Sequence, residues 1–231
     1  LTDLYKNIRT LTHEISLNIK NNVAVTTAYY QNKTYRPTPY KANIDIKLKD
    51  IKPISRLLGI DFSLSKNTVI EGSFTSGRTT IFQAFTHVDS LKYNNTMLVN
   101  TDVDLTASKI ADSTSVLAMA SVNSQNQSFG KTLKTSNLLA EAIWNKSHID
   151  FGLDADHVGQ TNNIRLKGGV DFAKDSTTIK MAPSALKLLE REWIFAEDNF
   201  TSIRGEDWTF NNVTLINREQ SVGLTGKLSN D

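Results

Sequence analysis

Cysteine is absent from this 231-residue chain. Its absence excludes a disulfide framework and any metal site built from thiolates. Lys and Arg number 26 against 24 Asp and Glu, so the net charge is only +2. The chain also lacks a dense run of basic residues, and nucleic-acid binding requires a concentrated basic face. We therefore expect no disulfide-stapled domain and no nucleic-acid partner.

Long apolar runs are also missing. No uninterrupted apolar stretch approaches the roughly 20 residues that span a bilayer, and no signal peptide is recognisable. The chain begins at Leu1 and ends at Asp231 after a polar Ser-Asn pair. We expect it to be a segment cut from a longer protein.

Sequence motifs for catalysis are absent. There is no Gly-x-Ser-x-Gly, the motif of a nucleophile elbow. Gly130-Lys131-Thr132 resembles the end of a phosphate-binding loop, but Gln125 occupies the position where such a loop needs its first glycine. The pattern therefore predicts no nucleotide site.

Acidic residues near a histidine form the best candidate metal site. Asp154, Asp156 and His157 fall within four positions of one another, and carboxylate and imidazole groups are common metal ligands. On a strand, however, the two aspartates share one face and the histidine points to the other. A solvated strand end explains the pattern better, and we expect no enzyme, no metal and no cofactor.

Apolar residues recur at every second position in much of the chain. Between residues 42 and 50, Ile44, Ile46 and Leu48 alternate with charged residues, which is typical of a strand with one apolar and one wet face. Proline (4) and glycine (11) are few, and Thr, Ser and Asn are frequent, a composition that favours strands with polar turns. Further strands are predicted over 60–64, 68–74, 79–88, 96–107, 115–122, 128–134, 138–144, 148–156, 163–172 and 177–182, and in the last forty residues.

Three segments depart from this meander. Residues 1–12 place apolar side chains at helical spacing and predict a short helix, and residues 13–27 alternate about Asn21-Asn22 and predict a β-hairpin. Prolines lead two short helical insertions, over 52–58 and 183–190.

The strands predict an all-β fold, a long antiparallel meander forming one continuous sheet over residues 1–231, with residues 1–41 hard to place. The apolar residues fit two architectures equally well. One is a sheet curled into an open groove, taco-like in section, and the alternative is a closed β-sandwich.

Repeated sequence patterns in the chain resemble those of a known family. Residues 48–65 with 69–74 combine a short helical piece with the step Ile70-Glu-Gly-Ser-Phe74, and Leu224-Thr-Gly-Lys-Leu228 repeats that step. This pattern, together with residues 85–93 and 193–229, is similar to the AsmA-like family, which includes the TamB-type envelope proteins, in the form found in Bacteroidetes. The likeness covers about residues 42–230.

The resemblance implies a long curled β-sheet with a hydrophobic groove, in a periplasmic segment of the cell envelope. It implies an inner-membrane anchor outside this chain, phospholipid acyl chains as ligand, and an outer-membrane barrel insertase as partner. The implied function is phospholipid transport between the inner and outer membranes, outer-membrane protein assembly, or both.

The cleanest alternating residues are the candidates for the groove lining. They are Ile44, Ile46, Leu48, Val103, Leu105, Leu153, Leu166, Val170 and Leu224.

A different reading of the residues makes the chain a closed β module of a surface adhesin or carbohydrate-binding protein. Its contacts would be Tyr29, Tyr30, Tyr35 and Tyr40, although aromatic residues covering a sheet edge explain these tyrosines more simply.

Overall fold

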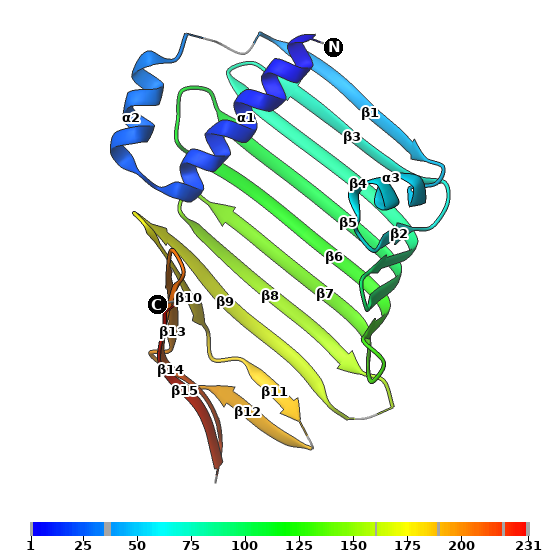
Figure 1. Cartoon of the computed structure of the whole chain (residues 1–231), viewed down its shortest axis with the longest axis vertical. Helices are drawn as coiled ribbons and strands as arrows, with labels where there is room; N and C mark the ends of the chain where they lie inside the picture. Colours follow the sequence, from blue (N-terminus) through cyan, green and yellow to red (C-terminus); the bar gives the residue numbers. More distant parts are fainter. Residues whose placement is uncertain (1, 35–37, 160, 189, 219, 230–231) are drawn as a thin grey trace.

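The computed structural model describes residues 2–34, 38–159, 161–188, 190–218 and 220–229. Figure 1 shows a broad sheet of long strands, with two helices at one end of it. The elements in chain order are α1 (Thr2–Lys20), α2 (Val23–Asn32), β1 (Tyr40–Leu48), α3 (Lys52–Leu58), β2 (Phe62–Leu64), β3 (Thr68–Ser76), β4 (Thr79–Tyr93), β5 (Thr96–Ile110), β6 (Val116–Phe129), β7 (Leu133–Asn145), β8 (His148–His157), β9 (Asn163–Ala173), β10 (Ser176–Met181), β11 (Ala185–Leu188), β12 (Arg191–Phe195), β13 (Phe200–Arg204), β14 (Asp207–Asn217) and β15 (Gln220–Leu228).

All fifteen strands belong to one antiparallel sheet. From β3 to β10 each strand pairs with the next in sequence, as expected for a meander, and β1 pairs with β3 at one edge. Residues with positive φ make several of the tight turns, among them Asn67 (62°) and Asn94 (51°), because asparagine tolerates the left-handed conformation. The predicted all-β meander is confirmed.

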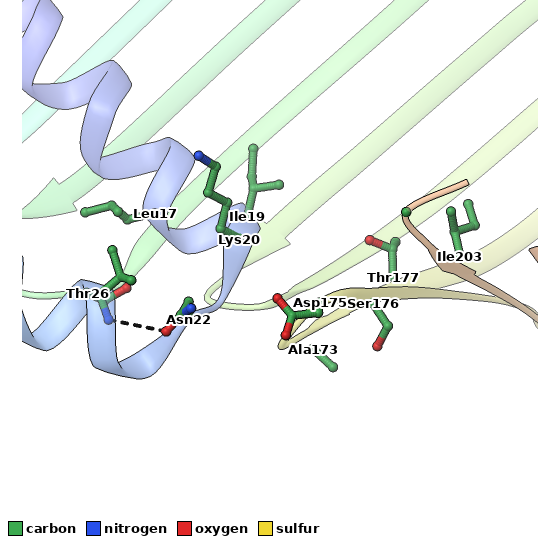
Figure 2. A pocket seen from close by; sticks show the side chains of 12 residues that line it. Leu17, Ile19, Lys20, Asn22, Thr26, Ala173, Asp175, Ser176, Thr177 and Ile203 are labelled. Atoms are coloured by element: carbon green, nitrogen blue, oxygen red, sulfur yellow. Dashed lines mark hydrogen bonds between the residues drawn. The ribbon is translucent and has the colours of Figure 1, made fainter. Parts of the chain in front are cut away.

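The sheet curls toward the face that carries the helices. In Figure 1 the central strands are seen face-on, whereas β13, β14 and β15 are seen nearly edge-on. Leu17 and Ile19 of α1 border a cleft of about 520 Å³ whose other wall includes Thr177 of β10 and Ile203 of β13. Figure 2 shows these side chains on the two sides of the cleft. Strands at the far side of the sheet therefore bend back toward the helices.

The predicted helix over residues 1–12 is confirmed but is longer, because α1 runs to Lys20. The predicted β-hairpin over 13–27 is wrong. Asn21 adopts a left-handed φ of 42° after α1, and Asn22 caps α2 by accepting a hydrogen bond from the Val25 amide at 3.3 Å. The Asn pair does turn the chain, but it joins two helices. Leu17 is buried against the sheet, and this packing overrides the local alternation of apolar residues.

Of the two Pro-led insertions, only the first is helical. Pro53 lies in the first turn of α3, and Gly59 ends the helix with a left-handed φ of 67°. The predicted helical insertion over 183–190 is wrong, because residues 185–188 form β11, which pairs with β12 and β9. The strand expected over 128–134 is also wrong, since a turn with Gly130 at φ 67° separates β6 from β7 there.

The fold buries little of its apolar surface. Its accessible surface is 15038 Å², whereas a compact monomer of 25.7 kDa exposes about 10,400 Å². Only eight hydrophobic side chains are buried among the described residues. A β-sandwich would bury the face between its layers, so the open single sheet accounts for the excess surface.

Candidate functional site

The strand pairing places apolar side chains in rows that cross the sheet. Directly paired residues in neighbouring strands share a face, so a row can be followed from strand to strand. Three such rows lie on the face toward α1, the inner face. The Leu105 row is Ile44, Gly72, Ala84, Leu105, Ala120, Ala142, Phe151, Gly168 and Met181. The Leu166 row is Ile46, Ile70, Thr86, Val103, Val122, Ala140, Leu153 and Leu166. The Val170 row is Ala42, Phe74, Phe82, Ala107, Ala118, Trp144, Ile149, Val170, Ile179, Thr201, Phe210 and Gly226.

All nine candidates from the sequence lie on this inner face. Seven belong to the three rows. Leu48 follows Ile46 by two residues in β1, and Leu224 precedes Gly226 by two in β15, so both share the face of those neighbours. None of the nine is buried, and Ile46, Leu105 and Leu224 are exposed at 46%, 37% and 51%.

Other inner-face residues were not singled out from the sequence. They are mainly the alanines and aromatic residues of the rows, such as Ala120, Ala142, Phe151 and Phe210. Alternation in Ala118-x-Ala120-x-Val122 carries the same signal as the longer apolar side chains. Small residues opposite large ones fit a curved face.

One glycine of the apolar-x-Gly-x-apolar steps makes room for an aromatic ring on the inner face. Gly168 lies under the ring of Phe151, and a Cβ added there would lie 2.5 Å from Phe151 Cζ and 2.5 Å from the Lys180 carbonyl oxygen. Glycine at this position therefore leaves room for the ring on the neighbouring strand. Gly226 pairs with Phe210, but a Cβ added there would have no heavy atom within 4 Å.

The rows contain almost no polar group. The Leu105 row has none, and the only hydroxyl of the Leu166 row, on Thr86, donates to the Val69 carbonyl at 2.8 Å. The Val170 row crosses twelve strands, and eleven steps of about 4.8 Å make a track of about 50 Å. The three rows therefore form a long apolar strip, and the polar residues of the inner face, such as Lys109 and Thr101, lie beside it.

The outer face is predominantly polar. Asp104 and Lys167, neighbours of Leu105 and Leu166 in sequence, project from it, as do two histidines. His87 Nδ1 lies 2.7 Å from Asp102 Oδ1, and this hydrogen bond raises the pKa of His87. His148 contacts Asp171 at 2.7 Å and Asp150 at 3.1 Å.

Both ring nitrogens of His148 thus face carboxylate oxygens, which only the protonated ring can satisfy as a double donor. Its pKa is raised, first by the hydrogen bond to Asp171 and then by that to Asp150. Each histidine binds carboxylates of its own sheet rather than facing an open site.

Asp154, Asp156 and His157 are the candidate metal ligands of the sequence, and no metal is expected at them. Asp156 accepts from the Asn137 amide at 3.0 Å, and His157 Nδ1 lies 2.9 Å from the Val158 carbonyl oxygen. Within the described ranges, no group of three His, Asp or Glu residues could hold a metal ion.

The helical hairpin α1–α2 closes one end of the inner face. Glu14 of α1 lies 2.7 Å from both Lys33 Nζ and Lys109 Nζ, and Tyr29 donates to it at 3.1 Å. Side chains of Glu14, Lys33 and Lys109 are each exposed by 4% or less. Lys109 belongs to β5 and is on the inner face, because it lies two residues from Ala107. This buried ionic cluster fixes the hairpin to the sheet.

Burial and charge act in opposite directions on this cluster. Burial alone would raise the pKa of Glu14, but hydrogen bonds and charge from Lys109 and Lys33 lower it overall. Burial lowers the pKa of Lys109 against the opposing influence of Glu14. Burial, followed by the Glu14 charge, raises the pKa of Tyr29 to about 12.

Two of the tyrosines considered as carbohydrate contacts make hydrogen bonds within the chain. The Tyr29 hydroxyl binds Glu14, and the Tyr30 hydroxyl donates to the Ser113 carbonyl at 2.9 Å. Tyr40 begins β1, and Tyr35 lies outside the described residues. Tyr29 and Tyr30 thus help to fix the helical hairpin.

Comparisons with protein-family models, with curated proteins and with solved structures find no match to this chain. Within the described part of the chain, no helix is long and apolar enough to cross a membrane.

Proposed function

We propose that the inner face carries phospholipid acyl chains, and that the chain is a groove segment of an AsmA-like envelope protein that moves phospholipid between the inner and outer membranes. The observation that carries the proposal is the continuous apolar strip of the three rows, which keeps solvent contact along its length except at the buried Phe74. Exposed apolar surface is costly in water, about 0.8 kcal/mol for each CH₂ that could be buried, and acyl chains would cover it.

The dimensions and chemistry of the strip favour a track over a pocket. A strip of about 50 Å is longer than one acyl chain, since two chains end to end span a bilayer core of about 30 Å. No polar group along the Leu105 row would hold a ligand at one position. A lipid could therefore slide along the strip with its headgroup toward water.

The resemblance to the AsmA-like family supports the cellular setting. The proposed setting is the periplasm, in a protein anchored in the inner membrane, with an outer-membrane barrel insertase as partner. Crosslinking of the chain to the insertase in bacterial cells would test the partner.

Photo-crosslinking from paired positions tests the proposal. A photoreactive residue at Leu105 or Leu166 should form phospholipid adducts in bacterial cells, because both side chains lie on the inner face. The same probe at Asp104 or Lys167, on the same strands but the outer face, is the matched control and should form few. Equal labelling at all four positions would refute the groove.

A further inference from the structure

Helix α3 exposes a compact apolar surface. Ile54, Leu57 and Leu58 are exposed at 58%, 86% and 63%, and Ile60 directly after the helix is also exposed. The first three are spaced i, i+3 and i+4 and so lie along one side of the helix. We call these four residues the apolar tip.

The apolar tip is held in place by an ordered helix. Ile51 and Ser55 are buried on another side of α3, where the Ser55 hydroxyl donates to the Ile51 carbonyl at 3.2 Å. After the helix, the Ile60 amide donates to the Ser55 carbonyl at 3.0 Å. The leucines thus project from a helix whose end is capped and whose adjacent side is packed through Ile51 and Ser55, so local fraying does not explain their exposure.

Basic residues lie close to the apolar tip. Lys52 and Arg56 are spaced i, i+4 on the side of α3 away from Ile54, Leu57 and Leu58, and Lys49 precedes the helix. None of these three basic residues makes an ion pair within the described ranges. Asp61 pairs with Lys92 at 3.1 Å, and Asp50 accepts from the Lys52 amide at 2.9 Å but keeps its charge. The net charge near the apolar tip is therefore positive.

The apolar tip lies at the end of the strands away from the helical hairpin (Figure 1). β2, which follows α3, pairs with the last residues of β4 through Phe62 and Tyr93. α1 borders Thr80 at the start of the same strand. Tyr93 lies thirteen residues after Thr80 along the strand, which is roughly 40 Å.

We infer that the apolar tip inserts into the surface of a phospholipid bilayer that contains anionic lipid. Apolar side chains on a short helix enter the boundary between headgroups and acyl chains, while neighbouring Lys and Arg bind anionic headgroups. The inference rests on the proposed function in one respect. Membrane insertion of the apolar tip would bring the open end of the inner face to a source or acceptor of acyl chains. Vesicle binding itself depends on the apolar tip and its basic neighbours and does not require the groove.

Vesicle flotation of the full chain tests the inference. The wild-type chain should float with vesicles of phosphatidylcholine and phosphatidylglycerol. Leu57→Ser with Leu58→Ser should weaken binding by about tenfold or more, because two largely exposed leucines lose their transfer into the bilayer. Val23→Ser with Val25→Ser, two exposed residues of α2, is the matched control and should change binding less than about twofold.

A second variant examines the charge. Lys49→Gln, Lys52→Gln and Arg56→Gln together should remove the preference for phosphatidylglycerol over phosphatidylcholine alone. Failure of the wild-type chain to float would overturn the inference and would leave the apolar tip to a protein partner. Equal binding by the wild-type chain and the Leu57/Leu58 variant would overturn it as well.

A photoreactive residue at Leu105 separates this inference from the proposed function. In the Leu57/Leu58 variant, loaded with phospholipid from mixed micelles, the Leu105 probe should still form lipid adducts while flotation is lost. Flotation without Leu105 adducts would refute the groove and support the apolar tip. Leu105 adducts with flotation unaffected by the leucine substitutions would support the groove and refute the role of the apolar tip.

Discussion

Docking of the α1–α2 hairpin on the sheet depends on one carboxylate, Glu14. Its two oxygens lie 2.7 Å from Lys33 Nζ and Lys109 Nζ. In Glu14→Gln both lysines stay buried without a full counter-charge, since Asp112, 3.5 Å from Lys33, is 46% exposed. Breaking a buried ion pair on one side costs about 3–5 kcal/mol. We expect the variant hairpin to detach far more often from the inner face than the wild-type hairpin.

Hydrogen exchange of the α1 and α2 amides measures this detachment. A loss of about 3–5 kcal/mol corresponds to exchange faster by about two to four orders of magnitude in the hairpin, with the central strands β5–β7 unchanged. Asp61→Asn is the control, because its pair with Lys92 is half exposed and such pairs contribute about 0–1 kcal/mol. Identical hairpin exchange in Glu14→Gln and wild type would refute the role given to the cluster.

Acid should reproduce the effect in the wild-type chain. The pKa of Glu14 is lower in the folded chain than its usual value, so the carboxylate stabilises docking above the unfolded-state pKa. That stabilisation is lost as the pH falls through the lowered folded-state pKa. Hairpin protection, corrected for the pH dependence of the intrinsic amide exchange rate, should fall with acid in the wild type and fall less in Glu14→Gln. Equal loss of protection in both would contradict the role of Glu14.

Two further predictions concern the sheet. Gly168→Ala should lower the free energy of unfolding by about 1–3 kcal/mol, because its Cβ would meet Phe151 and the Lys180 carbonyl. Thermal unfolding measures this loss, and Gly152→Ala, whose nearest atom would be 4.0 Å away, is the control and should be nearly neutral. Equal stability of the two variants would contradict the close approach at Gly168. By NMR titration His87 should show a pKa above its ordinary value, and Asp102→Asn should return it toward normal, since the hydrogen bond to Asp102 is the main cause. An unshifted His87 in the wild type would contradict the contact.

The strands and the shared face of the candidates were predictable because a strand has a fixed period of two. Once Ile44, Ile46 and Leu48 alternate with charged residues, their common face follows without knowledge of the neighbours. Which face of each strand joins which face of the next depends on register, and register is set by turns such as that at Asn94. The direction of curling depends on the complete sheet.

The wrong secondary-structure predictions fall where the local sequence fits both a helix and a strand and packing decides between them. Ile15, Leu17 and Ile19 alternate like a strand, yet Leu17 and Glu14 are three apart and meet the sheet from one side of a helix. Conversely, Leu186 lies in a leucine-rich segment after a proline, but its pairing with Trp193 and Ile164 makes it a strand residue. The partners of Glu14, at Lys33 and Lys109, are distant in sequence and left no local signal.

The rows run perpendicular to the strands, and this direction decides how the sheet can evolve. A ligand that follows the Val170 row crosses one strand after another, so no backbone hydrogen bond has to open for it to advance. Insertion of one hairpin lengthens such a path by about 10 Å and leaves its cross-section unchanged. Duplication of short hairpins would therefore be enough to set the length of the proposed groove.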